Sequence, residues 1–130
     1  MKPEHRELLE QLRPARRVLV VDDHPSFRRC ARELLTAEGF EVVGEAEDGK
    51  SGLALAAELA PELVLLDVQL PDLDGFEVAS RLLSRDRNLA IVLVSSRDRG
   101  EYGPLIEQSG ARGFVAKGEL SGPALERLLE

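Results

Sequence analysis

The feature that most constrains this chain is a regular alternation of short apolar runs with longer amphipathic segments. The runs are rich in Val, Leu and Ile and are almost unbroken by polar residues, as are strands buried on both faces of a parallel sheet. They occupy residues 18–21, 42–43, 63–66, 91–94 and 114–116. Strands that alternate with helices form a parallel sheet with helices on both faces and right-handed crossovers. The sequence therefore predicts an α/β domain with five strands and five helices.

Three of the amphipathic segments carry clear helix start or stop signals. The first has apolar residues at helical spacing over residues 27–35, a proline suited to its first turn and Gly39 suited to its C-terminal cap. The second stops before Pro61, which disfavours helix in the residue ahead of it. The third opens at Asp74, and Glu77 three residues later resembles a capping box.

The fourth helical segment differs from the others because Gly100, Gly103 and Pro104 lie within it. In a helix interior glycine costs roughly 1 kcal/mol and proline about 3 kcal/mol. We predict a short helix that begins near Pro104, preceded by a mobile loop over residues 97–103. The alternative is that Pro104 merely occupies a first turn, where it costs little. A fifth helix starts near Ser121 and continues to the end of the chain.

Composition and charge narrow the class of protein. The chain has 130 residues, 43% of them hydrophobic and 32% charged, which fits one soluble globular domain. A formal net charge of −7 argues against binding to nucleic acid, which requires clustered Lys and Arg. The nearest basic cluster is Arg13, Arg16 and Arg17, and a solvated linker explains it more simply.

The ends of the chain and its single cysteine predict where the protein resides. Cys30 has no partner for an intramolecular disulfide, so a reducing compartment is expected. No apolar run reaches the ~20 residues that span a bilayer, and the N-terminus lacks the apolar stretch of a signal peptide. We therefore expect a cytoplasmic protein that does not bind a membrane. Residues 1–16 are predicted to be an extension, either a short helix or a frayed segment, and residues 17–130 to form the domain.

Polar side chains follow four of the five apolar runs. In open α/β sheets, ligands bind in the crevice outside the carboxyl ends of the strands, where the strand order reverses. Any one of these residues alone would mean little, but together they predict a single site. The residues are Asp22 and Asp23 after the first run, Asp67 after the third, Ser95 after the fourth and Lys117 after the fifth.

The chemistry of this set is that of an aspartyl-phosphate site. Converging carboxylates repel one another, and burial raises their pKa values unless a cation is present. Oxygen ligands without His or Cys favour a hard cation, Mg²⁺ or Mn²⁺. A carboxylate beside such a metal can attack a phosphoryl donor. The metal, the Lys117 ammonium and the Ser95 hydroxyl could then stabilise the transferring group.

Four segments that carry these residues resemble the motifs of response-regulator receiver domains, in order and at similar spacing. They are VLVVDDHPSFRR, LVLLDVQLPDLDGFEV, IVLVSS and GFVAKGEL. The resemblance covers about residues 17–130, and DDHP, LPDLDG and KGEL are most similar to receivers of the NarL/LuxR type. It implies a flavodoxin-like (CheY-like) doubly wound sheet with strand order 2-1-3-4-5. It also implies a phosphorylation-controlled switch of two-component signalling, which is not an enzyme in the usual sense.

The resemblance also implies a role for each site residue. Asp67 would be the phosphoacceptor. Asp23 and Asp67 would bind Mg²⁺ directly together with the backbone carbonyl of Gln69, and Asp22 would act through water. Lys117 would hold the phosphate.

Two further residues would form the switch. Ser95 would hydrogen-bond the phosphoryl group and move on activation, and Phe114 would change rotamer in response. Signal would then emerge on the face formed by the fourth helix, fifth strand and fifth helix. If the loop at residues 97–103 is mobile as predicted, it would take part in this signalling. We choose Ser95 over Ser96 because it directly ends the apolar run, although both could be ordinary strand-end hydroxyls.

Other residues near these motifs have simpler interpretations. Gly118 stands where many receivers have a proline, a substitution common in the NarL-type group. Gln69 lies where side chains modulate the lifetime of the phosphoryl group. Asp72 and Asp74 read better as turn residues and a helix cap than as metal ligands, and His24 as a loop residue near the site.

The implied partners are a sensor histidine kinase or phosphotransfer protein, a downstream protein or effector domain, and a second copy of the chain on activation. Two other functions stay open. The first is a receiver fold that docks partners without phosphorylation. The second is a Mg²⁺-dependent phosphatase with an aspartyl nucleophile, disfavoured because haloacid-dehalogenase-like enzymes space their two aspartates differently. NarL-type receivers usually precede a DNA-binding domain, and an end at Glu130 fits both a free-standing and a separated receiver.

Overall fold

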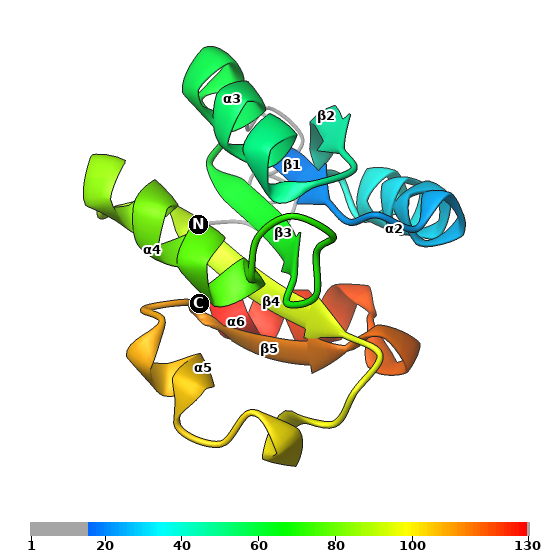
Figure 1. The fold of residues 1–130 in the computed structure, drawn as a ribbon. Coiled ribbons are helices and arrows are strands. Elements are labelled where there is room, and N and C mark those ends of the chain that lie inside the picture. Colours follow the sequence, from blue (N-terminus) through cyan, green and yellow to red (C-terminus); the bar gives the residue numbers. More distant parts are fainter. Residues whose placement is uncertain (1–15, 130) are drawn as a thin grey trace, which may run out of the picture.

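The computed structural model describes residues 16–129 and contains one five-stranded parallel sheet (Figure 1). The strand order is β2-β1-β3-β4-β5, as predicted from the resemblance. The strands are β1 (Arg17–Val21), β2 (Glu41–Ala46), β3 (Leu63–Asp67), β4 (Ala90–Ser95) and β5 (Gly113–Ala116).

Within the described residues, five α-helices and two short 3₁₀ helices connect the strands. The α-helices are α2 (Pro25–Ala37), α3 (Gly49–Leu59), α4 (Gly75–Arg85), α5 (Leu105–Gln108) and α6 (Gly122–Leu129). The 3₁₀ helices are η1 (Arg99–Glu101) and η2 (Lys117–Glu119). No helix in this part of the chain is both long enough and apolar enough to cross a membrane. Apart from Arg16, the predicted N-terminal extension lies outside the described residues.

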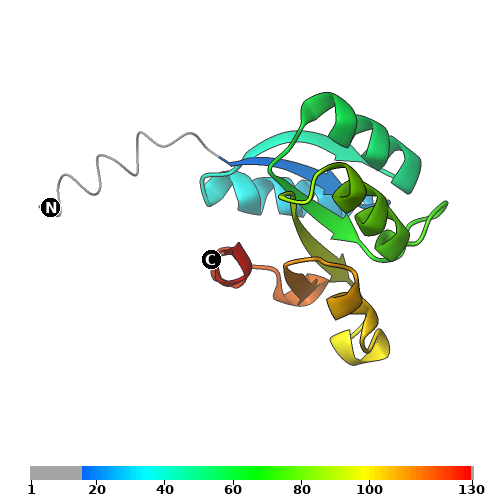
Figure 2. The same cartoon turned by 90° about the vertical axis from the view of Figure 1, so that its left-hand side faces the viewer.

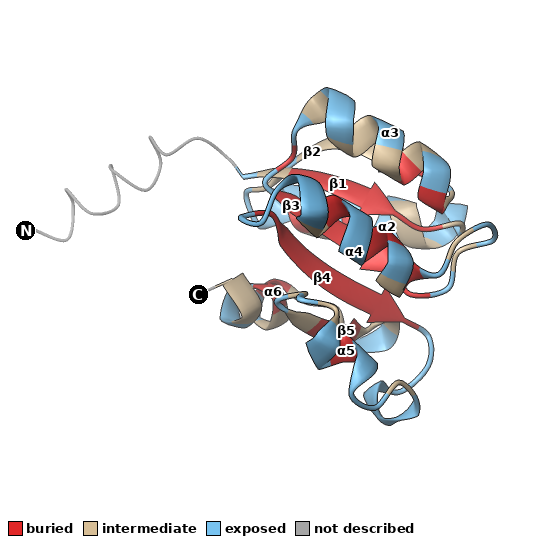
Figure 3. Ribbon diagram, turned by 60° about the vertical axis from the view of Figure 1, so that its left-hand side comes forward, coloured by how far each residue is buried: buried red, intermediate tan, exposed pale blue. Residues whose placement is uncertain are grey.

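The helices cover the two faces of the sheet, so the core has two layers (Figures 2 and 3). Because side chains alternate along a strand, Leu19 and Val21 of β1 face α3, α4 and α5, while Val18 and Val20 face α2 and α6. All four residues are fully buried, as are the central residues of β3 and β4. This two-sided burial explains why these strands consist of continuous apolar runs.

The strand at the edge of the sheet differs from the prediction. The apolar run at residues 42–43 marks only part of β2, which extends through Gly44 and Glu45 to Ala46. β2 is half-buried because it pairs only with β1. Its apolar pattern is therefore interrupted, and the run underestimated its length.

The helix termini confirm most of the predicted signals. Gly39 follows α2 with a φ of +92°, a left-handed conformation that glycine adopts without strain. Asp74 caps α4 by accepting a hydrogen bond from the backbone N–H of Phe76 at 2.7 Å. The capping box itself was wrong, because Asp74 accepts from Phe76 rather than from Glu77, and Glu77 pairs with Arg81 at 3.0 Å instead of reaching back to Asp74.

The segment after β4 has the short helix that its glycines and proline predicted. α5 has four residues, and Pro104 lies immediately before it. η1 and a turn containing Gly103, whose φ is +55°, fill the preceding loop. The predicted mobility of residues 97–103 stays a prediction.

The start of α4 lies so close to the end of β3 that only glycine fits at Gly75. A Cβ there would lie 2.6 Å from Cα of Val68 and would also collide with the carbonyl oxygen of Asp67. These backbone atoms cannot rotate away, so Gly75→Ala is expected to lower the free energy of unfolding by roughly 1–3 kcal/mol. Urea denaturation followed by circular dichroism measures this loss.

The matched control is Gly100→Ala, because a Cβ at Gly100 meets no atom within 4 Å. Its free energy of unfolding should stay within about 0.5 kcal/mol of wild type. Equal stability of the two variants would contradict the close packing of α4 on β3.

Candidate functional site

The register of the central strands places two aspartates side by side. Val21 of β1 pairs with Leu66 of β3, and the next residue in each chain segment is Asp22 and Asp67. Both carboxylates are withdrawn from solvent, with Asp22 0% and Asp67 2% exposed. Parallel pairing thus brings together two groups that are 45 positions apart in the sequence.

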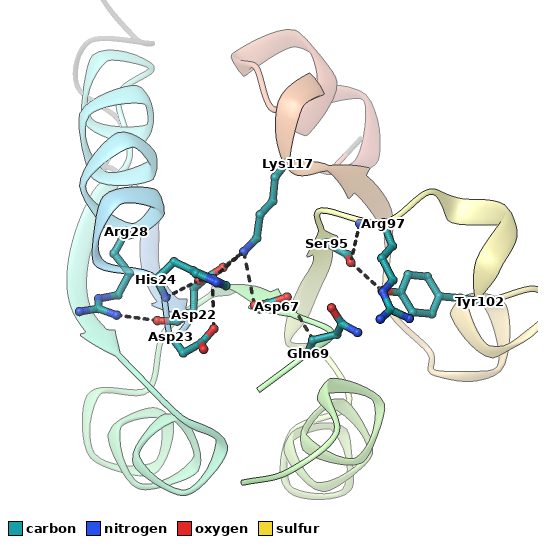
Figure 4. Close-up of polar contacts among 10 residues, drawn as sticks. All are labelled: Asp22, Asp23, His24, Arg28, Asp67, Gln69, Ser95, Arg97, Tyr102 and Lys117. Atoms are coloured by element: carbon teal, nitrogen blue, oxygen red, sulfur yellow. Dashed lines mark hydrogen bonds and ion pairs between the residues drawn. The ribbon is translucent and has the colours of Figure 1, made fainter. Parts of the chain in front are cut away.

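The same edge of the sheet presents the other predicted residues (Figure 4). Ser95, the last residue of β4, pairs with Ala116 of β5, and Lys117 follows directly. Asp23 follows Asp22, and its side chain is 36% exposed. The structure therefore brings all five strand-end residues of the predicted site to one edge.

Four potential metal ligands converge within this edge. One ligand atom each from Asp22, Asp23, His24 and Asp67 all lie within 4.8 Å of one another. Three of the four are carboxylates, which suit a hard cation.

Lys117 supplies the positive charge nearest to the carboxylates. Its Nζ lies 2.7 Å from Oδ2 of Asp22 and donates a hydrogen bond to Oδ2 of Asp67 at 3.4 Å. The ammonium also lies 4.7 Å from the ring centroid of Phe27, within the range of a cation–π interaction. One ammonium is thus shared between two buried carboxylates.

Because Lys117 is shared, its positive charge balances the negative charge of Asp67 only in part. Burial, followed by the charge of Asp22, raises the pKa of Asp67 from 3.8 to about 6. The backbone N–H of Gln69, which donates to Oδ1 at 3.1 Å, and the charge of Lys117 oppose this shift only in part. Additional positive charge at this edge would therefore stabilise the ionised Asp67.

Two buried carboxylate oxygens also lack hydrogen-bond donors. They are Oδ2 of Asp22 and Oδ1 of Asp23. Lys117 lies 2.7 Å from the former and His24 3.1 Å from the latter, close enough for ion pairing but without the angles of a hydrogen bond. Unsatisfied buried oxygens of this kind fit the ligand set of Mg²⁺.

His24 lies over the acidic cluster. Its Nδ1 is 3.0 Å from Oδ1 of Asp22 and 3.3 Å from Nζ of Lys117. A protonated Nδ1 can donate to Asp22, whereas only an unprotonated Nδ1 can accept from Lys117, so the two hydrogen bonds exclude each other. His24 is the loop residue near the site that the sequence predicted.

Gln69 and Arg97 form a polar pair beside the acceptor (Figure 4). With its amide oxygen turned toward Arg97, Gln69 accepts hydrogen bonds from Nε at 3.2 Å and from Nη2 at 3.3 Å. The pair bridges the segment after β3 and the segment after β4. Whether the carbonyl of Gln69 binds a metal stays a prediction.

The predicted switch residues contact a residue that the sequence did not identify, Tyr102. Its hydroxyl lies 2.6 Å from Oγ of Ser95, and its ring centroid lies 5.7 Å from that of Phe114. Ser95 and Phe114 are buried, whereas Ser96 is exposed. No sequence signal points to Tyr102, which lies in a glycine- and proline-containing loop.

Two more contacts near the site were missed or only partly predicted. Arg28 of α2 donates to the backbone carbonyl of Asp22 at 2.7 Å and pairs with Glu45 at 3.4 Å, and so ties the β1–α2 loop to β2.

Asp72 accepts hydrogen bonds from the backbone N–H groups of Gly49 and Lys50 at the start of α3. These bonds hold the pKa of Asp72 below its ordinary value, which fits a structural role.

Comparison with known proteins decides the family. Residues 18–128 match the response regulator receiver domain. This chain belongs to the response regulator receiver domain family. A receiver domain is a signalling switch of a two-component system, and here its acidic pocket is formed by Asp22, Asp23 and Asp67 with Lys117.

Similar proteins place this receiver near the NarL/LuxR group. It is 43% identical over 103 residues to the virulence factors putative positive transcription regulator BvgA of Bordetella pertussis, covering 79% of this chain and 49% of BvgA. It is 39% identical over 103 residues to a putative transcriptional regulator of Pseudomonas aeruginosa, covering 79% of this chain and 50% of that protein. The receiver thus spans about half the length of these curated relatives.

A solved structure agrees with this placement. The signal receiver domain of the putative response regulator NarL from Mycobacterium tuberculosis superposes with a TM-score of 0.78 at 34% identity, covering 90% of this chain and 98% of that one.

The raised pKa of Asp67 predicts an unusual pH dependence of stability in metal-free buffer. Between its ordinary pKa of 3.8 and its folded value of about 6, the folded receiver holds a proton that the unfolded chain has released. The contribution of Asp67 to the free energy of unfolding should therefore fall as pH rises through this window. Asp67→Asn removes the titration and should be more stable than wild type at about pH 7.5 by roughly 2–3 kcal/mol.

Urea unfolding in EDTA at about pH 4 and about pH 7.5 measures this difference. The advantage of the Asn variant should nearly vanish at the lower pH, where Asp67 is protonated in the folded state. An advantage that did not change with pH would contradict the raised pKa.

Proposed function

We propose that this receiver accepts a phosphoryl group from a phosphohistidine onto Asp67 in a Mg²⁺-dependent reaction. The observation that carries the proposal is a buried, undercompensated Asp67 flanked by Asp22, Asp23 and Lys117. The family makes a histidine kinase or phosphotransfer protein the donor. Phosphorylation-independent docking is the alternative that the experiments below would favour if labelling failed.

In the proposed transfer, a carboxylate oxygen of Asp67 forms a bond to phosphorus. The P–N bond of the donor breaks, and its electron pair leaves with the imidazole. Lys117, already within 3.4 Å of Asp67, is positioned to neutralise negative charge on the transferring group. Burial of Asp67 keeps competing water away from the acceptor.

The carboxylates of Asp23 and Asp67 and the backbone carbonyl of Gln69 would hold Mg²⁺ directly, and Asp22 would act through water. Mn²⁺ would suit the same oxygen ligands. Bound there, the cation would supply positive charge that stabilises both the ionised acceptor and the transferring phosphoryl group. The buried oxygens of Asp22 and Asp23 that lack a hydrogen-bond donor support this assignment.

The output would begin at Ser95. A phosphoryl group adds three acceptor oxygens at the end of β3, and Ser95 is the buried hydroxyl at the end of the adjacent strand. Movement of Ser95 would open space that Phe114 could fill, so the change would reach the surface formed by α5, β5 and α6. Because the similar proteins are named transcription regulators, we propose a DNA-binding domain or downstream protein as the recipient, with dimerisation as one form of the output.

Incubation with acetyl phosphate and Mg²⁺ is expected to add one phosphoryl group to the intact protein, measured by mass spectrometry. Asp67→Asn and a sample with EDTA should both stay unmodified, because the first lacks the acceptor and the second the cation. If neither acetyl phosphate nor a phosphohistidine donor labels Asp67, the docking function becomes the better interpretation.

Removal of a proposed metal ligand should weaken Mg²⁺ binding more than removal of a nearby structural carboxylate. We expect Asp23→Asn to reduce Mg²⁺ affinity by roughly 10-fold or more, measured by isothermal titration calorimetry. The matched control is Asp72→Asn, because Asp72 accepts hydrogen bonds from the start of α3 and lies outside the group of converging ligands. Equal losses in both variants would show that the cation responds only to net charge.

A further inference from the structure

The hydroxyl of Ser95 is already engaged, and its partners lie in the segment that follows β4 (Figure 4). Oγ of Ser95 accepts a hydrogen bond from the backbone N–H of Arg97 at 3.0 Å and lies 2.6 Å from the hydroxyl of Tyr102. Neither partner belongs to the acidic cluster. In the structure Ser95 is therefore bonded to the β4–α5 connection rather than to Asp67.

Tyr102 is held from both sides by aromatic rings. Its ring lies 5.7 Å from that of Phe76 in α4, nearly edge to face, and 5.7 Å from that of Phe114 in β5. The side chain thus contacts both proposed switch residues, Ser95 through its hydroxyl and Phe114 through its ring.

Apart from the pair formed by Arg97 and Gln69, the segment that carries Tyr102 is mostly exposed. Residues 96–101 are exposed, and residues 103–105 are exposed as well. Tyr102 is half-buried, and the next fully covered side chain is that of Ile106. Tyr102 therefore links this exposed segment to the core of the sheet, against which its ring packs.

We infer that Tyr102 is a positioning residue that holds the Ser95 hydroxyl away from Asp67 and thereby opposes phosphorylation. This inference rests on the proposed function, and it adds a regulatory residue to that site. Breaking the Ser95–Tyr102 hydrogen bond becomes part of the free-energy change on phosphorylation. Release of Tyr102 then frees the exposed segment and the face of Phe114.

The contact with Tyr102 restricts the Ser95 hydroxyl, and the direction of the hydrogen bond decides how. A hydroxyl has one proton to donate. If Ser95 donates to Tyr102, that proton must be withdrawn before it can reach a phosphoryl oxygen. If Tyr102 donates instead, Ser95 keeps its proton, and the 2.6 Å contact restrains only the position of Oγ.

The sharpest test is Tyr102→Phe, which keeps the ring between Phe76 and Phe114 and removes only the hydroxyl. The variant should bind beryllofluoride, a phosphoryl analogue, with Mg²⁺ roughly 2- to 10-fold more tightly than wild type, the range expected for one net hydrogen bond. Its labelling by acetyl phosphate should rise in the same direction. The matched control is Arg99→Gln, an exposed change in the same segment that should leave affinity unchanged.

A mutant cycle with Ser95→Ala separates positioning from packing. In the Ser95→Ala background the Tyr102→Phe change should have no effect on beryllofluoride affinity, because the hydroxyl has nothing left to hold. Urea unfolding of each variant establishes that it is folded under the conditions of the titration.

The hydrogen bond of Tyr102 can be followed directly by absorption, because Tyr102 is the sole tyrosine and the chain has no tryptophan. The near-ultraviolet difference spectrum on adding beryllofluoride and Mg²⁺ therefore reports Tyr102 alone among these chromophores. We expect the spectral shift of a lost phenol hydrogen bond in wild type and no such shift in Asp67→Asn.

The outcomes distinguish this inference from the function on which it rests. Asp67-dependent binding by wild type, with Tyr102→Phe binding no tighter, would overturn the role of Tyr102 and leave the proposed function intact. An effect of Tyr102→Phe that persisted without Ser95 would also overturn it, since the effect would then arise from packing. Absence of binding and labelling in wild type would overturn both.

Discussion

The structure depends on one constraint, that parallel pairing of β1 with β3 places Asp22 and Asp67 side by side and out of solvent. Burial of Asp67, followed by the charge of Asp22, raises the pKa of Asp67 to about 6, and Lys117, which the two carboxylates share, opposes this shift only in part. The ionised form of Asp67 therefore lowers the stability of the folded receiver, and a bound cation or an incoming phosphoryl donor can offset this cost.

The surroundings of this pair divide into rigid and adjustable parts. The strands that carry Asp22, Asp67 and Ser95 are packed on both faces by apolar residues, so their ends are fixed relative to one another. The groups that face them from outside come from connections: His24 from the β1–α2 loop and Tyr102 from the β4–α5 segment. The loops that carry these groups have fewer packing contacts to lose than the strands, so we expect them to respond first to a change of charge at this edge.

The sequence predicted the central strands and their polar ends because both follow from local pattern. Continuous apolar residues mark β1, β3 and β4, and the residue after each run must lie at the carboxyl edge of the sheet. The prediction fell short at β2, where half-burial allows Gly44 and Glu45 within the strand. It also missed the contacts of Arg28 and Tyr102, because each reaches the site from another element and no local pattern marks its partner.

The position of Tyr102 explains why the sequence before α5 forms helix poorly. Gly103, with a φ of +55°, and Pro104 restrict α5 to the four residues that follow them. In a longer helix Tyr102 would be fixed within a regular turn and would move only with the whole element. Ahead of a short one, it lies at the end of a 3₁₀ turn, where its hydroxyl reaches Ser95 while its backbone stays near the surface. The glycines and proline that weaken this helix are therefore what allow one side chain to join an exposed segment to the buried edge of the sheet.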